Sequence, residues 1–469
     1  MKRAAHATKK PEATFWILVI FLAVIAFTGG ASRVDVDSLI VLRPLSVLAC
    51  ALALLTLRRD DLKGREWLFL GFGALFALAL LHVVPLPPGL WHMLPGRQDF
   101  AGIDRITGLG DSWRPLTLTP MNGWHALLSL FAPLAVLLLG VQLNRQDLYR
   151  LLPLLIAIGA ISGLFGLLQL LGNPDGPLYL YDVTNNGSAV GLFANRNHAA
   201  LLLAILPPML ALWLLLGGLD HPRHRIRLVL AVSLGILSFL LILVTGSRSA
   251  LLISLVGLVV ALLIYGNRSL KSGGRRVSKL ALYKALALGT AALVGLVALT
   301  VYFSRAEAIK RLLGQSIENE NRLEYWQISM SMFWKYFPFG SGSGSFAEVY
   351  QIAEPDYILN LFYLNHAHND FLETGVTFGL PGLLLVVAGG LLYARRSVAL
   401  WRIKDDRSRS LLAARMAGIL LLMLSIACFS DYPLRTPLLA CFFAVFSLWF
   451  TEPAEDRANI APPTSRMEG

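Results

Sequence analysis

The chain has 469 residues, of which 56% are hydrophobic and only 15% charged, and its mean hydropathy is +0.62. A soluble globular protein has about 25% charged residues, so this composition excludes an ordinary soluble enzyme and indicates an integral membrane protein. The formal net charge of +12 is spread over separate short segments, which argues against nucleic acid as a partner.

Long apolar runs predict an all-α polytopic membrane protein with about 12 transmembrane helices. A helix that crosses a bilayer needs about 20 mostly apolar residues. The predicted spans cover approximately residues 14–30, 38–57, 67–84, 123–142, 151–171, 198–217, 228–244, 250–265, 281–303, 379–394, 411–430 and 434–450. The first run follows a basic tail, but its apolar stretch is long and its cleavage signal weak, so we expect an anchor rather than a signal peptide.

The distribution of Lys and Arg predicts the orientation of the chain. With both termini in the cytoplasm, the connections on that side carry 27 of the 41 Lys and Arg residues, and the outer segments carry 13. An excess of basic residues marks the cytoplasmic side of membrane proteins. We therefore expect both termini in the cytoplasm and the long connections on the outer side of the membrane.

Three outer segments are long, and we expect them to belong to a single integral membrane domain, residues 1–469. Residues 85–122 are expected to form an interfacial amphipathic segment, and residues 172–197 a turn-rich loop. Residues 304–378 are expected to form a large cap on the outer side, with predicted helices at 304–314 and 319–337. The chain has three cysteines, Cys50, Cys428 and Cys441, all within predicted spans, where buried packing is a better interpretation than a disulfide framework.

Arginines at the outer ends of predicted spans are candidates for binding a phosphate group. Arg248 lies in a connection of only a few residues between two spans, and Arg196 lies where the sixth span begins. Ionisable groups at membrane depth are costly and tend to mark function. The planar guanidinium binds phosphate oxygens in pairs, so converging arginines would hold a diphosphate. Arg322, in the cap, is the third candidate. Snorkelling to lipid phosphate, or for Arg322 a helical pair with Glu318, is the alternative.

The segment HAHNDFLE, residues 366–373, is the second candidate region. His366 or His368 would accept a proton from a sugar hydroxyl near neutral pH. Asn369 and Asp370 are possible supporting residues, and Asp370 with Glu373 resembles a capping box at the start of a helix. Two alternatives are loop histidines bonded to backbone, or a metal site that also includes Asp370 and Glu373.

Four stretches resemble the superfamily of bacterial O-antigen ligases and O-antigen polymerases, which are integral membrane glycosyltransferases. They are GLFANRNHAALLL, TGSRSALL, NRLEYWQISMSMFWKYFPFGSGSGSF and HAHNDFLETGVTFGLPG, between residues 191 and 382. The last stretch carries the ligase pattern of His-Asn, nine residues and Gly-x-x-Gly, with His368-Asn369 followed by Gly379 and Gly382.

The resemblance implies a metal-independent, inverting glycosyltransferase that needs no cofactor and no metal. His368 would be the catalytic base, and Arg248, Arg322 and Arg196 would bind the diphosphate of an undecaprenyl diphosphate-linked glycan donor. The expected acceptor is lipid A–core, as in O-antigen ligases, and the expected location is the bacterial inner (cytoplasmic) membrane with the active site facing the periplasm. Alternatives are a repeat-unit polymerase, a protein O-oligosaccharyltransferase, a polytopic transporter and a non-catalytic scaffold. We see no internal repeat of the kind that many transporters have.

Overall fold

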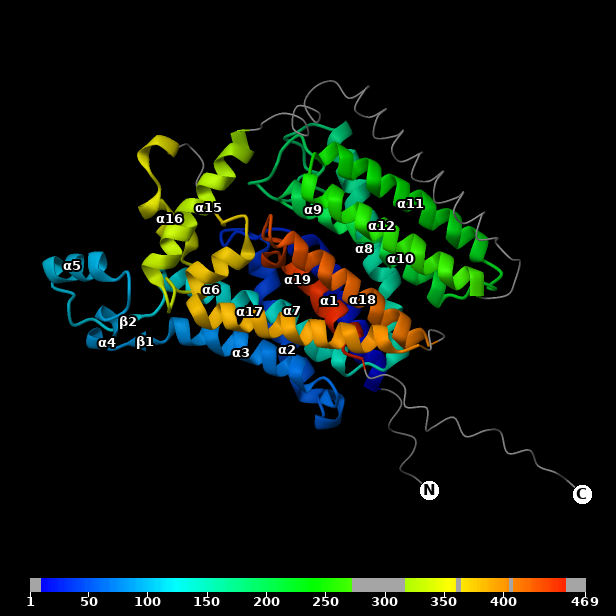
Figure 1. Cartoon of the computed structure of the whole chain (residues 1–469), viewed down its shortest axis with the longest axis horizontal. Helices are drawn as coiled ribbons and strands as arrows, with labels where there is room; N and C mark the ends of the chain where they lie inside the picture. Colours follow the sequence, from blue (N-terminus) through cyan, green and yellow to red (C-terminus); the bar gives the residue numbers. More distant parts are fainter. Residues whose placement is uncertain (1–9, 272–316, 360–363, 405–407, 453–469) are drawn as a thin grey trace, which may run out of the picture.

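A computed structural model describes residues 10–271, 317–359, 364–404 and 408–452. Helices make up nearly all of its regular structure (Figure 1). The first part of the chain forms α1 (Lys10–Thr28), α2 (Leu39–Thr56), α3 (Glu66–Val83), α4 (Pro88–His92), α5 (Gln98–Thr107), α6 (Pro120–Ser129), α7 (Phe131–Val141), α8 (Arg145–Leu171), α9 (Arg196–Ala204), α10 (Leu206–Leu216), α11 (His224–Thr245) and α12 (Arg248–Lys271). The later part forms α15 (Ile317–Tyr336), α16 (Phe346–Ala353), α17 (Asp370–Arg402), α18 (Arg409–Ala427) and α19 (Pro437–Phe450).

Short elements complete the described chain. Two two-residue strands, β1 (Pro85–Leu86) and β2 (Arg114–Pro115), pair antiparallel. Three 3₁₀ turns are η1 (Arg59–Leu62), η2 (Asp356–Ile358) and η3 (Pro433–Arg435). The turn η3 lies between α18 and α19.

The predicted multi-pass helical architecture is confirmed. Within the described ranges, nine helical stretches are long and apolar enough to cross a membrane, and α6–α7 and α9–α10 each count as one stretch. Two shorter apolar helices are Glu12–Thr28, within α1, and Pro437–Phe450, which is α19. Together these eleven stretches correspond to eleven of the predicted apolar runs. The remaining run, 281–303, and the predicted helix 304–314 lie outside the described residues. The predicted helix 319–337 is present as α15.

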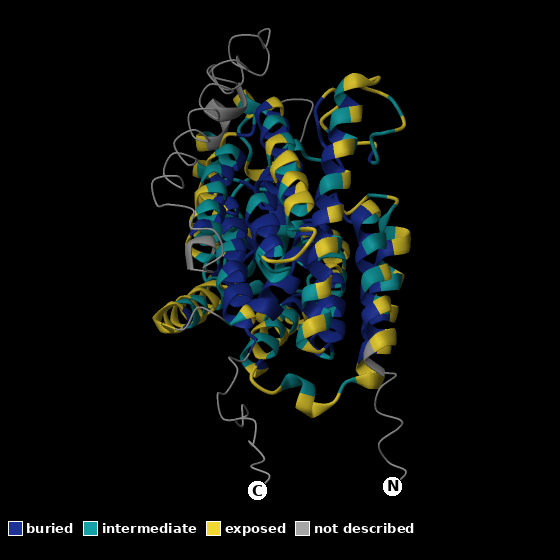
Figure 2. Cartoon of the chain, turned by 90° about the vertical axis from the view of Figure 1, so that its right-hand side faces the viewer, coloured by how far each residue is buried: buried dark blue, intermediate teal, exposed yellow. Residues whose placement is uncertain are grey.

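The outer faces of the long helices carry large apolar side chains. Leu55 of α2 is 83% exposed, Leu70 of α3 is 72% exposed and Leu391 of α17 is 67% exposed. Figure 2 shows such exposed residues along helices whose opposite faces are buried. A soluble protein rarely exposes large contiguous apolar patches. These faces therefore fit contact with lipid chains.

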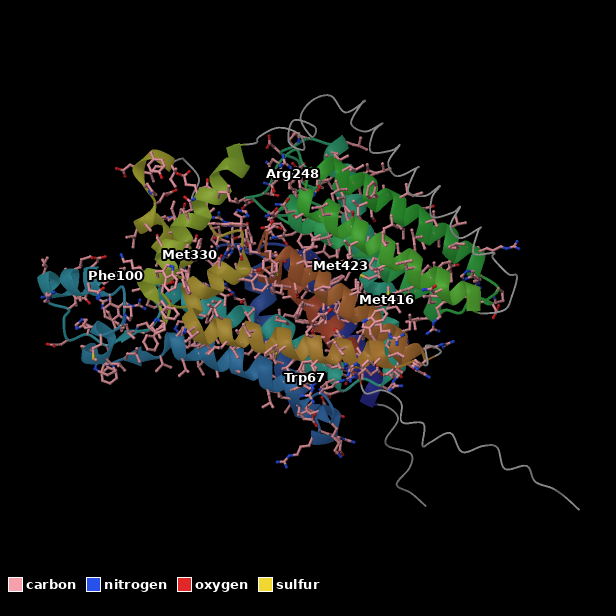
Figure 3. All side chains as sticks on the ribbon, viewed as in Figure 1. Trp67, Phe100, Arg248, Met330, Met416 and Met423 are labelled. Carbon is pink, nitrogen blue, oxygen red and sulfur yellow. The ribbon has the colours of Figure 1, made fainter. Side chains whose placement is uncertain are left out.

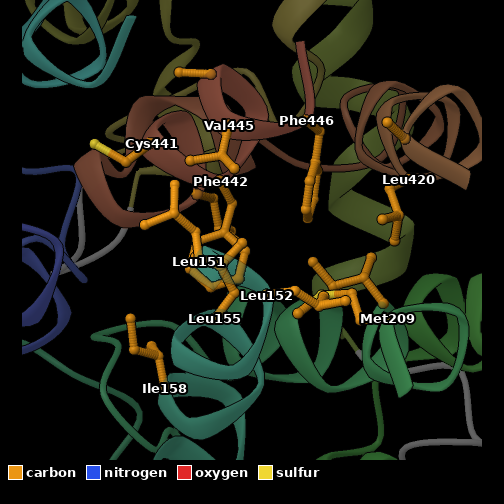
Figure 4. Packing of buried hydrophobic residues seen from close by; sticks show 14 of the residues in the cluster. Leu151, Leu152, Leu155, Ile158, Met209, Leu420, Cys441, Phe442, Val445 and Phe446 are labelled. Atoms are coloured by element: carbon orange, nitrogen blue, oxygen red, sulfur yellow. The ribbon is translucent and has the colours of Figure 1, made fainter. Parts of the chain in front are cut away.

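The main core lies where α8, α10, α18 and α19 meet (Figure 4). Leu152 and Leu155 of α8 are fully buried beside Phe442 and Phe446 of α19. The Nε1 of Trp449 donates to the carbonyl of Leu148 at 3.2 Å, which satisfies the one polar group of a fully buried ring. All three cysteines are free and buried, which agrees with their predicted packing role.

One end of the molecule carries α4, α5, α15 and α16 (Figure 1). There, α15, α16 and the start of α17 enclose a second, smaller apolar cluster that includes Met332, Tyr336, Tyr350 and Val376. This cluster fixes α15 and α16 against α17 and so positions the segment immediately before α17.

Glycines allow the loop between α15 and α16 to approach its neighbours closely. A Cβ on Gly342, whose φ is +101°, would lie 2.0 Å from the Cα of Thr117. Gly379, with a φ of +61°, interrupts α17 with non-helical backbone, and a Cβ there would lie 2.1 Å from the carbonyl oxygen of Pro338. Only glycine tolerates such an approach at positive φ. The first glycine of the Gly-x-x-Gly pattern is thus required by packing.

A buried arginine attaches the segment that contains β1, α4, α5 and β2 to this loop. Arg97 is fully buried and donates to the carbonyls of Pro95, Leu116 and Gly340 at 2.7–3.2 Å. Burial lowers the pKa of Arg97 to about 10, so the group stays charged at neutral pH. The segment is therefore fixed to the α15–α16 loop by charge-assisted hydrogen bonds.

Candidate active site

The segment before α17 holds His368 in an unusual backbone conformation. Its φ is +50°, which makes it the one non-glycine residue with positive φ in the described chain. Such a conformation persists only where surrounding contacts impose it. Here the backbone N–H of Ala367 donates to Glu373 at 2.9 Å, and the N–H of Asp370 donates to the carbonyl of Cys428 at 2.9 Å. Trp326 of α15 donates from Nε1 to the carbonyl of Ala367 at 3.0 Å.

The helix that follows begins with a different cap from the one predicted. The Asn369 side chain accepts from the N–H groups of Phe371 and Leu372, both at 3.1 Å, so Asn369 is the N-cap. Asp370 is the first helical residue and accepts from Arg435 Nε at 2.7 Å. The capping-box prediction for Asp370 and Glu373 was therefore wrong, because both carboxylates are used by an arginine far along the chain. A supporting role of Asn369 in catalysis stays a prediction.

Three histidines converge on Tyr432. The ring centroids of His366, His368 and His198 lie 4.4, 5.0 and 5.0 Å from the centroid of the Tyr432 ring. His198 comes from α9, whereas the other two precede α17. The fold therefore brings the FANRNHAALL and HAHNDFLE stretches together on one aromatic ring.

Asp431 is the carboxylate of this group. Its Oδ1 lies 3.3 Å from Nδ1 of His368 and 3.7 Å from Nε2 of His198, and the residue is 4% exposed. Burial opposes ionisation, but the two histidines outweigh it and hold the pKa of the Asp431 carboxyl well below its ordinary value. Asp431 is thus a carboxylate at neutral pH, and it faces the predicted base.

A second carboxylate network lies on the His366 side. Nδ1 of His366 is 2.9 Å from Oε1 of Glu373, and the same oxygen lies 3.1 Å from Nη1 of Arg435. Glu373 and Asp370 together raise the pKa of Arg435 despite its burial, so Arg435 remains a cation. Glu373, itself paired with Arg435, therefore orients His366, whereas His368 faces Asp431.

Sequence reasoning missed Asp431, Tyr432 and Arg435. Asp431 and Tyr432 lie in the short connection between the last two predicted spans, and Arg435 lies at the start of the last one. The rule that selects Arg248, an ionisable residue at a span end, also selects Asp431 and Arg435.

The predicted arginines differ in how far the structure describes them. Arg196 is the first residue of α9 and Arg248 the first of α12. Their neighbours Asn197, His198 and Ser249 line a cavity of about 10 Å³ together with Asp431, so both helix starts lie beside the carboxylate. Figure 3 shows Arg248 at the end of α12. Arg322 belongs to α15, but its side chain lies outside the described residues.

The predicted metal alternative finds no support in the described geometry. His366 bonds to Glu373, His368 faces Asp431, and Asp370 bonds to Arg435. Across the described ranges, no group of three or more His, Cys, Asp or Glu side chains is arranged to hold a metal ion.

Comparison with known proteins gives one match. Residues 233–387 match a family described as O-antigen ligase. The matched range includes Arg248, Arg322, His366, His368 and Asn369, and excludes Arg196 and Asp431. No curated protein matches the chain. Members of the matched family are glycosyltransferase-like enzymes of the ligase and polymerase type. The resemblance of this multi-pass membrane protein to the O-antigen ligase superfamily is therefore confirmed over residues 233–387.

Proposed function

We propose that the protein transfers a glycan from a polyprenyl diphosphate carrier to an acceptor hydroxyl on the outer side of the bacterial inner membrane. The observation that supports this most strongly is the position of His368. It lies against Asp431 and Tyr432, beside the helix starts that carry Arg196 and Arg248. A base and two cations at one membrane-facing end are the groups that such a transfer requires.

The geometry suggests which nitrogen of His368 acts. Nδ1 faces Asp431 at 3.3 Å, so a proton on Nδ1 is favoured by the carboxylate and Nε2 keeps its lone pair. Nε2 would accept the proton of the acceptor hydroxyl as its oxygen attacks the anomeric carbon. Asp431 would then stabilise the imidazolium that forms. His198 is 2% exposed, so it would interact with the Asp431 carboxylate and would not contact the substrate.

The arginines act on the leaving group. As the bond between the anomeric carbon and the diphosphate oxygen breaks, negative charge develops on that oxygen. Arg248, Arg196 and Arg322 would stabilise this charge, a contribution that grows in the transition state. Attack opposite the leaving group inverts the anomeric configuration. Because arginines would meet the diphosphate charge, no divalent metal is required.

The topology of the proposal follows from the Lys and Arg distribution. About 12 spans with both termini in the cytoplasm would place α15, α16 and the segment before α17 in the periplasm as a cap. The carrier diphosphate would then lie at the outer membrane surface, within reach of the starts of α9 and α12.

Within the family we favour a ligase that uses lipid A–core as acceptor, because of the His368-Asn369 spacing to Gly379 and Gly382. A repeat-unit polymerase is the alternative. Deletion of the gene distinguishes them: loss of a ligase leaves long polymer on the carrier and bare lipid A–core, whereas loss of a polymerase leaves single repeat units.

The direct test is transfer by purified protein in nanodiscs, with a lipid-linked glycan as donor and lipid A–core as acceptor, with and without EDTA. We expect an inverted glycosidic product in both conditions. Absence of transfer both to lipid A–core and to a second lipid-linked repeat unit would contradict the proposed function. Loss with EDTA that a divalent ion restores would contradict the metal-independent mechanism alone.

A further inference from the structure

A cavity of about 270 Å³ lies on the other side of the connection between α18 and α19. Asp431 and Pro433 line the small space beside the starts of α9 and α12, whereas Leu434 and Arg435 line this larger cavity. The connection therefore separates two spaces. The helix starts that carry Arg196 and Arg248 lie at the small space through Asn197 and Ser249, and the larger cavity is unassigned.

The wall of this cavity contains buried polar atoms that make no hydrogen bond within the described part of the chain. They are Nδ1 of His125, Oε2 of Glu348 and Nε2 of His366, from α6, α16 and the segment before α17. Buried polar groups are normally hydrogen-bonded, so three such atoms around one cavity point to a polar ligand. Imidazole nitrogens and a carboxylate oxygen together suit hydroxyl groups, which both donate and accept.

Arg43 adds a positive charge to this cavity. It lies within α2 and makes no hydrogen bond or ion pair with the residues that the structure describes. A charged residue inside a span is costly and tends to mark function. Its guanidinium matches the geometry of a phosphate or a carboxylate group. Within the same lining, Glu348 accepts from Asn122 at 2.6 Å, and Glu373 is paired with Arg435.

The rest of the lining is apolar and comes from membrane-spanning helices. Leu42 of α2, Leu75 and Ala79 of α3, and Leu128 of α6 all contribute. A ligand that satisfies both parts is amphiphilic, with a sugar between Glu348 and His366 and apolar chains along α2 and α3. The volume is slightly below the roughly 300–1,000 Å³ typical of small-ligand pockets, which fits one sugar unit and not a long polymer.

We propose that this cavity binds the acceptor, and that the acceptor is an amphiphilic glycan with a negatively charged group beside Arg43. The assignment to the acceptor rests on the proposed transfer function, because the helix starts that carry Arg196 and Arg248 adjoin the other space. His366 contributes to the lining and contacts the same Tyr432 ring as His368, so an acceptor hydroxyl at this end of the cavity lies next to the proposed base.

The test measures binding of glucuronate and of glucose to the full chain in phosphatidylcholine nanodiscs. The variants are Arg43→Gln, Arg43→Lys and Glu348→Gln. Arg105→Gln is the matched control, because Arg105 is an exposed arginine of α5 away from the cavity. We expect glucuronate to bind more tightly than glucose, and inorganic phosphate to compete with it. Arg43→Gln should weaken glucuronate binding roughly 10- to 100-fold, the scale of one charge-assisted hydrogen bond.

Two further variants and a transfer assay complete the test. Arg43→Lys should retain the preference for glucuronate at lower affinity, and it replaces Arg43→Gln if that variant does not fold. Glu348→Gln should weaken both sugars. In the transfer assay, Arg43→Gln should raise the acceptor KM while kcat and the donor KM change less than about 3-fold.

The proposal is overturned if glucuronate and glucose bind equally, or if Arg43→Gln binds glucuronate as the Arg105→Gln control does. It is also overturned if phosphatidylglycerol in the nanodisc abolishes glucuronate binding, because the anion is then a lipid headgroup. Transfer with an unchanged acceptor KM in Arg43→Gln refutes the acceptor site and leaves the proposed function intact. Arg43-dependent glucuronate binding without any transfer refutes the proposed function and leaves an anionic-sugar site.

Discussion

The Nδ1 atom of His368 lies 3.3 Å from the Oδ1 atom of Asp431, although His368 precedes α17 and Asp431 follows α18. In the proposed mechanism this carboxylate favours a proton on Nδ1 and leaves Nε2 free to act as the base. His366, two residues earlier, is oriented instead by Glu373. The two histidines thus have separate carboxylate partners and are expected to have separate roles.

Asp431→Asn tests the positioning role of this carboxylate. The amide keeps the shape but removes the charge that stabilises the imidazolium, so turnover should fall, though less than for His368→Ala. Donor affinity should stay close to wild type, because the arginines proposed to bind the donor are unchanged. A purely structural role would weaken donor binding together with turnover, and this outcome would contradict the assignment.

Arg248→Ala tests the diphosphate contact. Loss of the guanidinium should weaken donor binding and lower kcat by roughly 10²–10³-fold, the scale of removing one group that stabilises leaving-group charge. Arg248→Lys should restore only part of this, because an ammonium cannot form the paired hydrogen bonds. Measurement of donor affinity and kcat for both variants checks it. Full activity of either variant would remove Arg248 from the site.

Arg435→Met tests the stability of the network behind His366. The substitution leaves Asp370 and Glu373 buried without their cation, which should cost about 3–5 kcal/mol of folding free energy. Thermal unfolding in detergent measures the loss, with Arg105→Met as the exposed control. Asp370→Asn in the Arg435→Met background should recover part of the stability. Equal unfolding temperatures for Arg435→Met and the control would contradict the ion-pair interpretation.

Reporters test the proposed orientation. A reporter fused after residue 270 should give a cytoplasmic signal, and one inserted near residue 350 should give a periplasmic signal. If both report the same side, the number of spans between them is wrong by one, and the site would not face the periplasm as proposed.

The sequence predicted most of the fold because apolar runs of sufficient length leave few alternatives in a membrane. The residues that it selected by a local spacing, His368 with Gly379 and Gly382, lie within the range that matches the family. Gly379 illustrates why such a spacing is informative, because its backbone must pass within contact of Pro338.

The sequence does not predict in the same way which charged side chains contact each other in the folded protein. Nothing in the local pattern around Asp370 indicates that its partner is Arg435. The N-cap position expected of Asp370 is occupied by Asn369. The same applies to Asp431, whose importance depends on His198 and His368 from two other parts of the chain. Charge patterns at span ends identify such residues, but only the fold shows which of them meet.

His368→Ala tests the central claim most directly, by separating donor binding from turnover in purified protein in nanodiscs. The variant removes the proton acceptor and leaves the arginines in place. Donor affinity should therefore stay close to wild type while turnover falls by roughly 10²–10⁴-fold, the usual contribution of a general base. His366→Ala, the matched control, should lose less. Wild-type turnover in a His368→Ala protein that elutes as a folded species would contradict the assignment of His368 as the base.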